Sequence, residues 1–252
     1  MTELPHVLVL TPMKDAADCL PRYAELLDAL DWPRARLSLG IIEGDSSDGT
    51  GAALEALRPR LAARCARVTI VHHDQGFTLP PGVPRWEPAW QLTRRKVLAR
   101  ARNRLLMTAL ADEEWVLWID ADMVEYPRDI IGTLTGTGFD IVTPHAVLAA
   151  GGPSFDRNAW ADGGRTLLED CRGTGAVRLD AVGGTMLLVR ADLHRDGLVF
   201  PPFPYGVRSG RIRDRTVWGA GEIETEGLGI MAADMGVQCW GLPDLEVLHR
   251  RA

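Results

Sequence analysis

Two aspartates, Asp120 and Asp122, follow a short apolar run and offer the most suggestive chemistry in this sequence. The run, residues 115–119 (WVLWI), is aromatic and branched, which predicts a buried β-strand. Side chains at positions i and i+2 of an extended chain point the same way, so the two carboxylates should face one spot at the strand's end. Two adjacent anions repel unless a cation joins them, and hard oxygen ligands suit Mg²⁺ or Mn²⁺ carrying a diphosphate. A solvated turn is the alternative.

The bulk composition indicates an ordinary globular protein and excludes several classes of function. The chain has 252 residues, 46% hydrophobic and 25% charged, with a net charge of −6. One large α/β domain fits these values. No basic face carries interleaved aromatics, so we expect no nucleic-acid partner. No stretch is apolar for long enough to span a bilayer, and the four cysteines lack metal-binding spacing. We therefore expect a cytoplasmic protein with reduced thiols.

Strands and helices alternate along the first half of the chain. Apolar runs predict strands at residues 6–10, 37–42 and 67–71, and the first should stop at Thr11 and Pro12 because proline removes a ladder donor. Helical spacing follows, beginning near Pro21 and again near Thr50, and a third helical pattern covers residues 89–110. This alternation predicts a mainly parallel sheet with right-handed crossovers and helices on both faces.

The second half continues with further strands, a long loop and one more helix. Strands are predicted at residues 139–143, 177–180, 182–189, 237–240 and 245–248, and a helix at residues 222–235. Residues 145–164 are irregular and rich in glycine and aromatics, which suggests an active-site loop. Gly183 and Gly184 suggest a bulge or close backbone approach to a ligand. A mobile flap is predicted at residues 200–221, with a basic tip that carries Arg208, Arg211, Arg213 and Arg215.

Ligands of parallel sheets bind beyond the carboxyl ends of the strands. This rule places Thr11, Pro12, Glu43 and Asp45 on the same rim as the aspartate pair. The acidic groups there are expected to accept hydrogen bonds from a ribose or a base. Loop solvation and helix capping remain open as alternatives for Asp45.

Arginines are concentrated in the third predicted helix. Arg100 and Arg104 are four residues apart and share a face. That face is expected to point guanidinium groups at a diphosphate. A solvated helix surface is the alternative.

Eight sequence blocks, in order, resemble the fungal Golgi α-1,6-mannosyltransferases that build the mannan of N-glycans. The blocks are LTPMKDAADCLPRYAELLDAL (10–30), SLGIIEGDSSDGT (38–50), RKVLARARNRLL (95–106), WVLWIDADMVEYP (115–127), DGGR (162–165), LDAVGGTMLLVRADLHRDGLVFPPF (179–203), IETEGLGIMAADMG (223–236) and GLPDLEVLHR (241–250). Together they cover nearly the whole chain.

The resemblance implies a GT-A glycosyltransferase fold, GDP-mannose as donor, and Mn²⁺ or Mg²⁺ as cofactor. Asp122 would be a direct metal ligand, His249 would complete the coordination, and Asp120 would support the metal or the ribose. Arg100 would contact the diphosphate. The domain would span residues 1–252, with a nucleotide-binding half (1–125) and an acceptor-side half (126–252).

The resemblance also implies transfer of a hexose with retention of the anomeric configuration, onto a carbohydrate or another hydroxyl-bearing acceptor. Glu224 or Glu226 would lie near the acceptor or the anomeric carbon. No clear nucleophile stands out, which favours departure of the nucleotide and attack of the acceptor on the same face. Oligomers are possible.

The sequence departs from that family in three places. We expect no N-terminal membrane anchor, residues 208–218 look like an insertion beside the acceptor site, and the chain stops just past His249, which would leave that ligand on a loose tail.

Two other functions compete with this interpretation. A non-catalytic carbohydrate-binding or scaffolding subunit is disfavoured because Asp120, Asp122 and His249 are all retained. A sugar nucleotidyltransferase would want a glycine-rich phosphate loop after the first strand, and residues 11–14 (TPMK) are not one.

Overall fold

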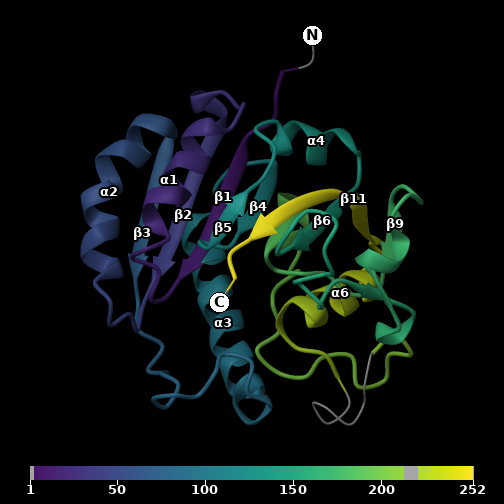
Figure 1. Cartoon of the computed structure of the whole chain (residues 1–252). Helices are drawn as coiled ribbons and strands as arrows, with labels where there is room; N and C mark the ends of the chain where they lie inside the picture. The colour runs from purple at the N-terminus through teal and green to yellow at the C-terminus, as the bar shows by residue number, and fades with distance from the viewer. Residues whose placement is uncertain (1–2, 213–220, 252) are drawn as a thin grey trace.

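A nine-stranded sheet forms the centre of the molecule (Figure 1). The computed structural model describes residues 3–212 and 221–251. The strands lie in the order β3-β2-β1-β4-β10-β6-β11-β5, and β9 pairs with β11. Their bounds are β1 Val7–Met13, β2 Leu37–Glu43, β3 Arg67–His72, β4 Trp115–Ile119, β5 Met123–Glu125, β6 Ile141–Val147, β9 Val177–Leu179, β10 Met186–Arg190 and β11 Cys239–His249.

The first half of the sheet is parallel, as predicted. β1 pairs with β2 and with β4, and β2 pairs with β3, all in parallel register. The prediction that β1 stops at Thr11 and Pro12 is wrong, because the strand runs on to Met13. β4 accompanies β1 only as far as Leu10, so Pro12 lies where the sheet is open on that side and its missing N–H breaks no ladder bond.

The second half of the sheet is mixed, although β6 and β11 keep the direction of the first four strands, so the sheet is mainly parallel as predicted. β10 runs antiparallel to both β4 and β6. In the fully described segment between β6 and β10, no α-helix carries the chain back to the other end of the sheet. β10 therefore begins at the end where β6 stops and runs in the opposite direction. The two strands predicted at residues 237–240 and 245–248 are one strand, β11, with a register shift between Leu242 and Glu246.

Helices cover both faces of the sheet, as predicted. Their bounds are α1 Leu20–Ala29, α2 Thr50–Arg64, α3 Pro88–Ala109, α4 Ile130–Gly136, α5 Ala191–Arg195 and α6 Glu224–Asp234. Alternation along β1 divides the core: Val7 and Val9 pack with α1, α2 and α4, whereas Leu8 and Leu10 pack with α3, α5 and α6. Short 3₁₀ turns lie at Arg34–Arg36, Asp162–Gly164 and Leu168–Cys171, and a two-stranded ribbon joins β7 Trp160–Ala161 to β8 Thr166–Leu167.

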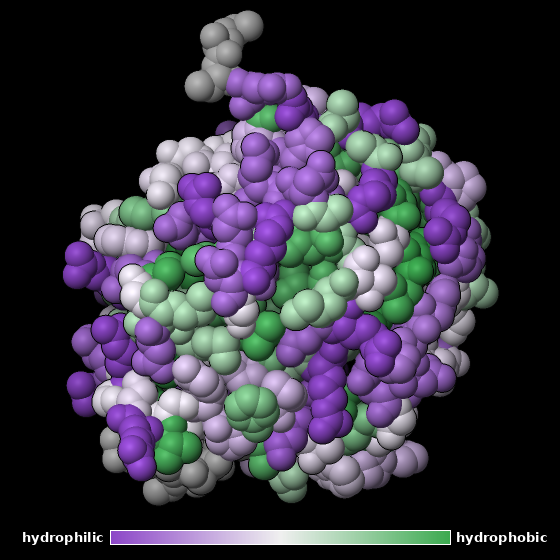
Figure 2. Space-filling view, turned by 180° about the vertical axis from the view of Figure 1, so that it is seen from behind, coloured by the Kyte–Doolittle hydropathy of each residue, from purple (hydrophilic) through white to green (hydrophobic). Residues whose placement is uncertain are grey.

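The surface is mixed in character. On the face seen from behind, hydrophilic residues surround small hydrophobic areas (Figure 2). Among the described residues, no helix has the length and apolar character needed to span a membrane. All four cysteines are free thiols.

Candidate active site

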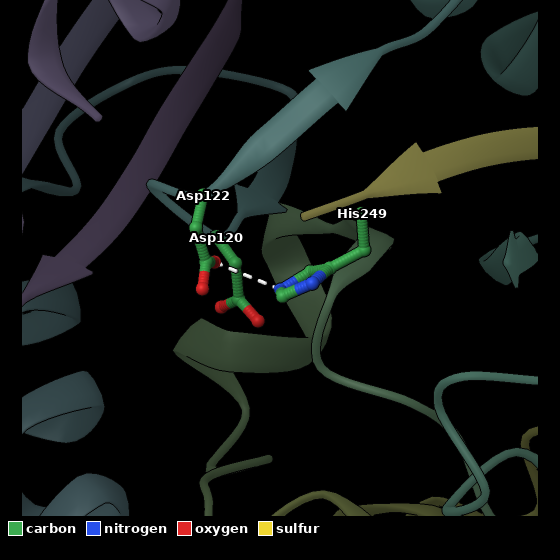
Figure 3. A group of neighbouring side chains, drawn as sticks. All are labelled: Asp120, Asp122 and His249. Carbon is green, nitrogen blue, oxygen red and sulfur yellow. Dashed lines mark ion pairs between the residues drawn. The ribbon is translucent and has the colours of Figure 1, made fainter. Parts of the chain in front are cut away.

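Three side chains with metal-ligating atoms converge at the C-terminal end of β4. Asp120 follows β4 directly, Asp122 precedes β5, and His249 is the last residue of β11. One ligand atom from each lies within 4.8 Å of the others. Figure 3 shows the imidazole directed at the two carboxylates. Within the described residues, this is the only such group of His, Cys, Asp and Glu side chains.

Strand pairing brings these distant segments together. β4 is buried between β1 and β10, and the Asp120 N–H donates to the Thr185 carbonyl at 3.0 Å just beyond β10. β5 pairs antiparallel with the end of β11, where His249 is opposite Met123. The Arg250 N–H also donates to the Asp122 carbonyl at 3.0 Å. The ladder therefore fixes the separation of the aspartates and the histidine.

The imidazole of His249 is held in one orientation. Its Nδ1 lies 2.7 Å from the Arg250 carbonyl, which can only accept, so Nδ1 carries the proton and donates. Its Nε2 is thereby turned to Asp122 Oδ1, 2.8 Å away. The expected loose tail is wrong: His249 is only 7% exposed, and the Arg250 side chain is paired with Asp18 at 2.7 Å.

The two carboxyl groups have opposite electrostatic environments. Burial raises the pKa of Asp120 to about 7, with Arg102 opposing and Asp122 adding to the rise. Burial also acts on Asp122, but hydrogen bonding and charge from His249 outweigh it and lower that pKa. Burial likewise opposes ionisation of His249, and the bond to Asp122 outweighs it, so the pKa of His249 is raised.

The donor set fits a divalent metal ion. Two carboxylates and one imidazole combine hard oxygens with the nitrogen that Mn²⁺ accepts, and three protein ligands leave positions for a substrate. Burial and the neighbouring charge of Asp122 raise the pKa of Asp120, and a cation bound here would act in the opposite direction. A hollow of about 300 Å³ has Asp122 in its wall, together with Cys19, Met123 and Arg250.

The arginines beside the aspartates are not the ones that the sequence pattern indicated. Arg102 is buried, and its Nη2 lies 3.3 Å from Asp120 Oδ1. The charge of Arg94 interacts with those of Glu224 and Asp120, and Arg85 Nη1 lies 3.8 Å from Asp122 Oδ2. These three guanidinium groups surround the acidic pair.

The predicted face with Arg100 and Arg104 points away from this centre, and that prediction needs correction. Both side chains are exposed and line a hollow of about 490 Å³ with Gln75, Met107 and Thr108. Residues two apart on a helix lie on nearly opposite sides, so the packing that turns Arg102 inward turns Arg100 and Arg104 outward.

Glu224 and Glu226 have different surroundings, although Arg95 contacts both. Glu226 is fully buried, with its carboxylate bonded to Arg95 Nη1 at 2.5 Å and to Trp160 Nε1 at 2.8 Å. Glu224 lies 3.4 Å from Arg102 Nε, the arginine that also reaches Asp120. Burial opposes ionisation of Glu224, but the charges of Arg102 and Arg95 prevail and lower its pKa.

Glu224 also has a strained backbone. Its φ is 59°, a left-handed conformation that is unusual for a non-glycine residue and is often found at functional sites. The conformation starts α6 and holds the buried carboxylate beside the arginines.

The paired glycines make room for protein side chains. A Cβ at Gly183 would lie 2.3 Å from an Asp156 oxygen, and one at Gly184 would lie 2.6 Å from Arg102 Nη1. The Asp156 carboxylate accepts hydrogen bonds from the N–H groups of Gly184 and Thr185, at 2.7 and 3.0 Å. The close approach predicted for a ligand is therefore made here by Asp156 and Arg102.

The predicted nucleotide-contacting residues lie at the rim, but most have partners within the protein. The buried Thr11 hydroxyl bonds to the Tyr23 hydroxyl at 2.8 Å, and Glu43 bonds to His72 Nδ1 at 2.9 Å. Asp45 accepts the N–H groups of Gln75 and Gly76, at 2.9 and 3.0 Å. Pro12 is half-buried on the same edge.

Several residues of this site were missed from the sequence. Arg102 and Arg94 are part of the arginine-rich helix, but neither was singled out. Phe155 and Asp156 lie in the loop predicted to be part of the active site, and no local pattern distinguishes them. Residues 213–220, which include Arg213 and Arg215 and belong to the predicted flap and insertion, lie outside the described residues. Arg211 lies 3.8 Å from Asp180.

Comparison with known protein sequences gives a consistent set of relatives. The Anp1 family model matches residues 1–171 and 169–204. The mannan polymerase complex subunit mnn9 of Schizosaccharomyces pombe is 32% identical over 97% of this chain and 80% of its own length. The MNN9 subunit of Candida albicans is 29% identical over 97% of this chain and 74% of its own length.

Comparison with solved structures supports the fold. The mannosyltransferase PcManGT from Pyrobaculum calidifontis, solved with GDP-Man and Mn²⁺, has a TM-score of 0.59 at 19% identity over 98% of this chain. GalNAc-T7, solved with UDP, GalNAc and Mn²⁺, has a TM-score of 0.60 at 15% identity, again over 98%. The present chain spans 57% and 44% of those two chains. The predicted GT-A fold is confirmed.

Proposed function

This chain belongs to the Anp1 family, and on that premise we propose that it is a metal-dependent, retaining glycosyltransferase that moves mannose from GDP-mannose to a hydroxyl-bearing acceptor. The coarser assignment, a glycosyltransferase of GT-A fold, agrees with both sets of comparisons.

The convergence of Asp120, Asp122 and His249 is the observation that carries the proposal. Breaking a glycosyl-phosphate bond leaves negative charge on the departing diphosphate. A divalent cation bound here would stabilise that charge by several kcal/mol. In this assignment Asp122 and His249 are ligands, and Asp120 is a further ligand or supports the ribose.

Arginines supply the remaining positive charge in the proposed site. Arg94 makes no hydrogen bond or ion pair to another described residue, although it lies in the field of Glu224 and Asp120. It is therefore available to bind a diphosphate. Arg102 has a different role, since its contacts with Asp120 and Glu224 hold both carboxylates in place.

Glu224 is the acidic residue that we assign to the reaction centre. Arg102 links it to the aspartate pair. The contacts of Glu224 with Arg102 and Arg95 are 3.4 Å long, whereas Glu226 is bonded to Arg95 at 2.5 Å and to Trp160 at 2.8 Å. A carboxylate there would stabilise the positive charge that develops on the sugar ring as the nucleotide leaves. It would also orient the incoming hydroxyl on the same face of the sugar.

The proposal extends to the halves of the domain and to partners. Residues 1–125 would bind the nucleotide, with Thr11, Pro12, Glu43 and Asp45 at the edge of the nucleoside site, and residues 126–252 would bind the acceptor. Relatives described as subunits of mannan polymerase complexes suggest a carbohydrate acceptor and a partner subunit. The cytoplasmic location stays a prediction.

Calorimetric titration with GDP-mannose, GDP, UDP-glucose and UDP, each with and without Mn²⁺, tests the function. We expect GDP ligands to bind more tightly than UDP ligands, and to bind much more weakly in EDTA than with Mn²⁺. Asp122→Ala should abolish the metal-dependent part of this binding. Asp28→Ala is the matched control, because it removes an exposed aspartate of α1 that pairs with Arg60. Binding that resists both EDTA and Asp122→Ala would refute the proposal.

A further inference from the structure

The ring of Phe155 stacks on the ring of His249. The two centroids are 3.9 Å apart and the planes differ by 20°. Phe155 is 36% exposed, so it does not belong to the hydrophobic core. It lies in the irregular segment between β6 and β7, far along the chain from the end of β11. The contact therefore covers one face of a proposed metal ligand with an aromatic ring.

The segment that carries Phe155 is held firmly in place. The Phe155 N–H donates to the Ala146 carbonyl at 2.8 Å. The neighbouring Ser154 hydroxyl lies 2.9 Å from His145 Nε2, and His145 Nδ1 donates to the Pro243 carbonyl at 3.1 Å. His145 therefore receives the hydroxyl proton at Nε2 and ties the segment to β6 and β11.

Asp156 connects the same segment to the opposite side of the site. Its Oδ2 accepts hydrogen bonds from the Gly184 N–H and from both the N–H and the hydroxyl of Thr185, at 2.7, 3.0 and 3.0 Å. The Thr185 carbonyl accepts the Asp120 N–H at 3.0 Å. Residues 154–156 thus contact the histidine side of the site through Phe155 and the aspartate side through Asp156.

The orientation of an imidazole plane decides whether it can bind a metal. The lone pair of Nε2 lies in the ring plane, so rotation about the Cβ–Cγ bond turns it away from the ion. The contact of Nε2 with Asp122 would give way to a metal ion, and the hydrogen bond from Nδ1 to the Arg250 carbonyl then restrains that rotation at a single point. A flat ring stacked on one face restrains the whole plane.

We propose that Phe155 is a positioning residue, which keeps the His249 imidazole in the plane required for metal ligation. This inference rests on the proposed function, because it assumes that the site binds a divalent cation. It adds a residue that touches neither the metal nor the sugar and acts through His249. Asp156 positions the other side of the site in the same way, through the backbone of Thr185.

Direct measurement of Mn²⁺ binding in the presence of GDP tests the role of Phe155. Electron paramagnetic resonance of free Mn²⁺ gives an affinity without any need for transfer activity. We expect Phe155→Ala and Phe155→Leu to weaken Mn²⁺ binding about tenfold, as loss of a residue that orients a ligand does elsewhere. Phe155→Tyr should bind like the unaltered protein, because it keeps the flat ring.

Two controls separate positioning from packing. Phe139→Leu removes another stacked pair, since Phe139 lies 4.2 Å from Trp240 with an interplanar angle of 8°, and it should leave Mn²⁺ affinity unchanged. In a His249→Ala background, Phe155→Ala should produce no additional loss, because the residue that it positions is absent.

The outcomes distinguish this inference from the proposed function. If the unaltered protein binds no Mn²⁺ with GDP, both proposals are overturned. If it binds Mn²⁺ and Phe155→Leu binds equally well, only the positioning role is overturned. A loss that persists in the His249→Ala background also overturns it, because Phe155 would then act through some other group.

Discussion

His249 Nε2 lies 2.8 Å from Asp122 Oδ1, although half of the chain separates the two residues. The pairing of β5 with the end of β11 brings them together, and the Nδ1 bond to Arg250 directs Nε2 inward. An imidazole that shares a carboxylate in this way can exchange the shared proton for a metal ion. The first prediction follows from this contact.

His249→Ala should weaken GDP binding only when Mn²⁺ is present. The metal ion would then lose one of its protein ligands, while the direct contacts of the nucleotide with the protein would persist. We expect a loss of about tenfold to a hundredfold with metal and almost none in EDTA, by calorimetry. Equal weakening under both conditions would remove His249 from the coordination sphere.

Asp120→Asn should stabilise the metal-free protein at alkaline pH and weaken Mn²⁺ binding. The pKa of Asp120 is raised to about 7 from 3.8. The folded state therefore resists an ionisation that the unfolded chain undergoes freely, and stability falls as pH rises between these two values. The amide removes this penalty.

Urea denaturation in EDTA measures the effect of Asp120→Asn. We expect a gain in unfolding free energy of roughly 1–3 kcal/mol at pH 8 and none near pH 4. An equal difference between variant and unaltered protein at the two pH values would show that the carboxyl does not titrate in this way. The stability of the anionic site would then need another explanation.

Arg94→Ala should weaken GDP binding, whereas Arg100→Ala and Arg104→Ala should leave it within about twofold. Arg94 lies in the field of Asp120 and Glu224, and the other two side chains line a hollow on the exposed face of α3. Loss of one charge-assisted contact to a phosphate corresponds to about tenfold in affinity. Calorimetry with GDP and Mn²⁺ gives the comparison, and the reverse ranking would restore the assignment made from the sequence.

Glu224→Gln and Glu226→Gln should have different effects. Glu226 is bonded to Arg95 at 2.5 Å, a closer pair than Glu224 forms with Arg95 and Arg102 at 3.4 Å. Removing one charge from such a close buried pair destabilises a protein by about 3–5 kcal/mol. Glu224→Gln should reduce transfer of mannose more than it reduces thermal stability. Mannose release from GDP-mannose and a thermal melt, measured on the same samples, separate the two effects, and a loss of stability without loss of turnover in Glu224→Gln would contradict its assignment.

Much of the fold followed from local patterns. The branched run at Trp115–Ile119 predicted the buried strand β4, and the alternation of strands and helices predicted the parallel half of the sheet and helices on both faces. These features follow from residues close together in the chain. The direction of β10 did not, because it depends on the route of the chain through an irregular segment.

The candidate site, too, was predicted from the sequence only in part. The sequence by itself placed Asp120 and Asp122 on one strand end, since the period of an extended chain fixes their common direction. It could not select Arg102 and Arg94 over Arg100 and Arg104, because arginines occur on every side of α3 and helical periodicity gives relative angles without saying which side is buried. Only packing against the sheet and α6 decided that, and only strand pairing brought His249 to the carboxylates.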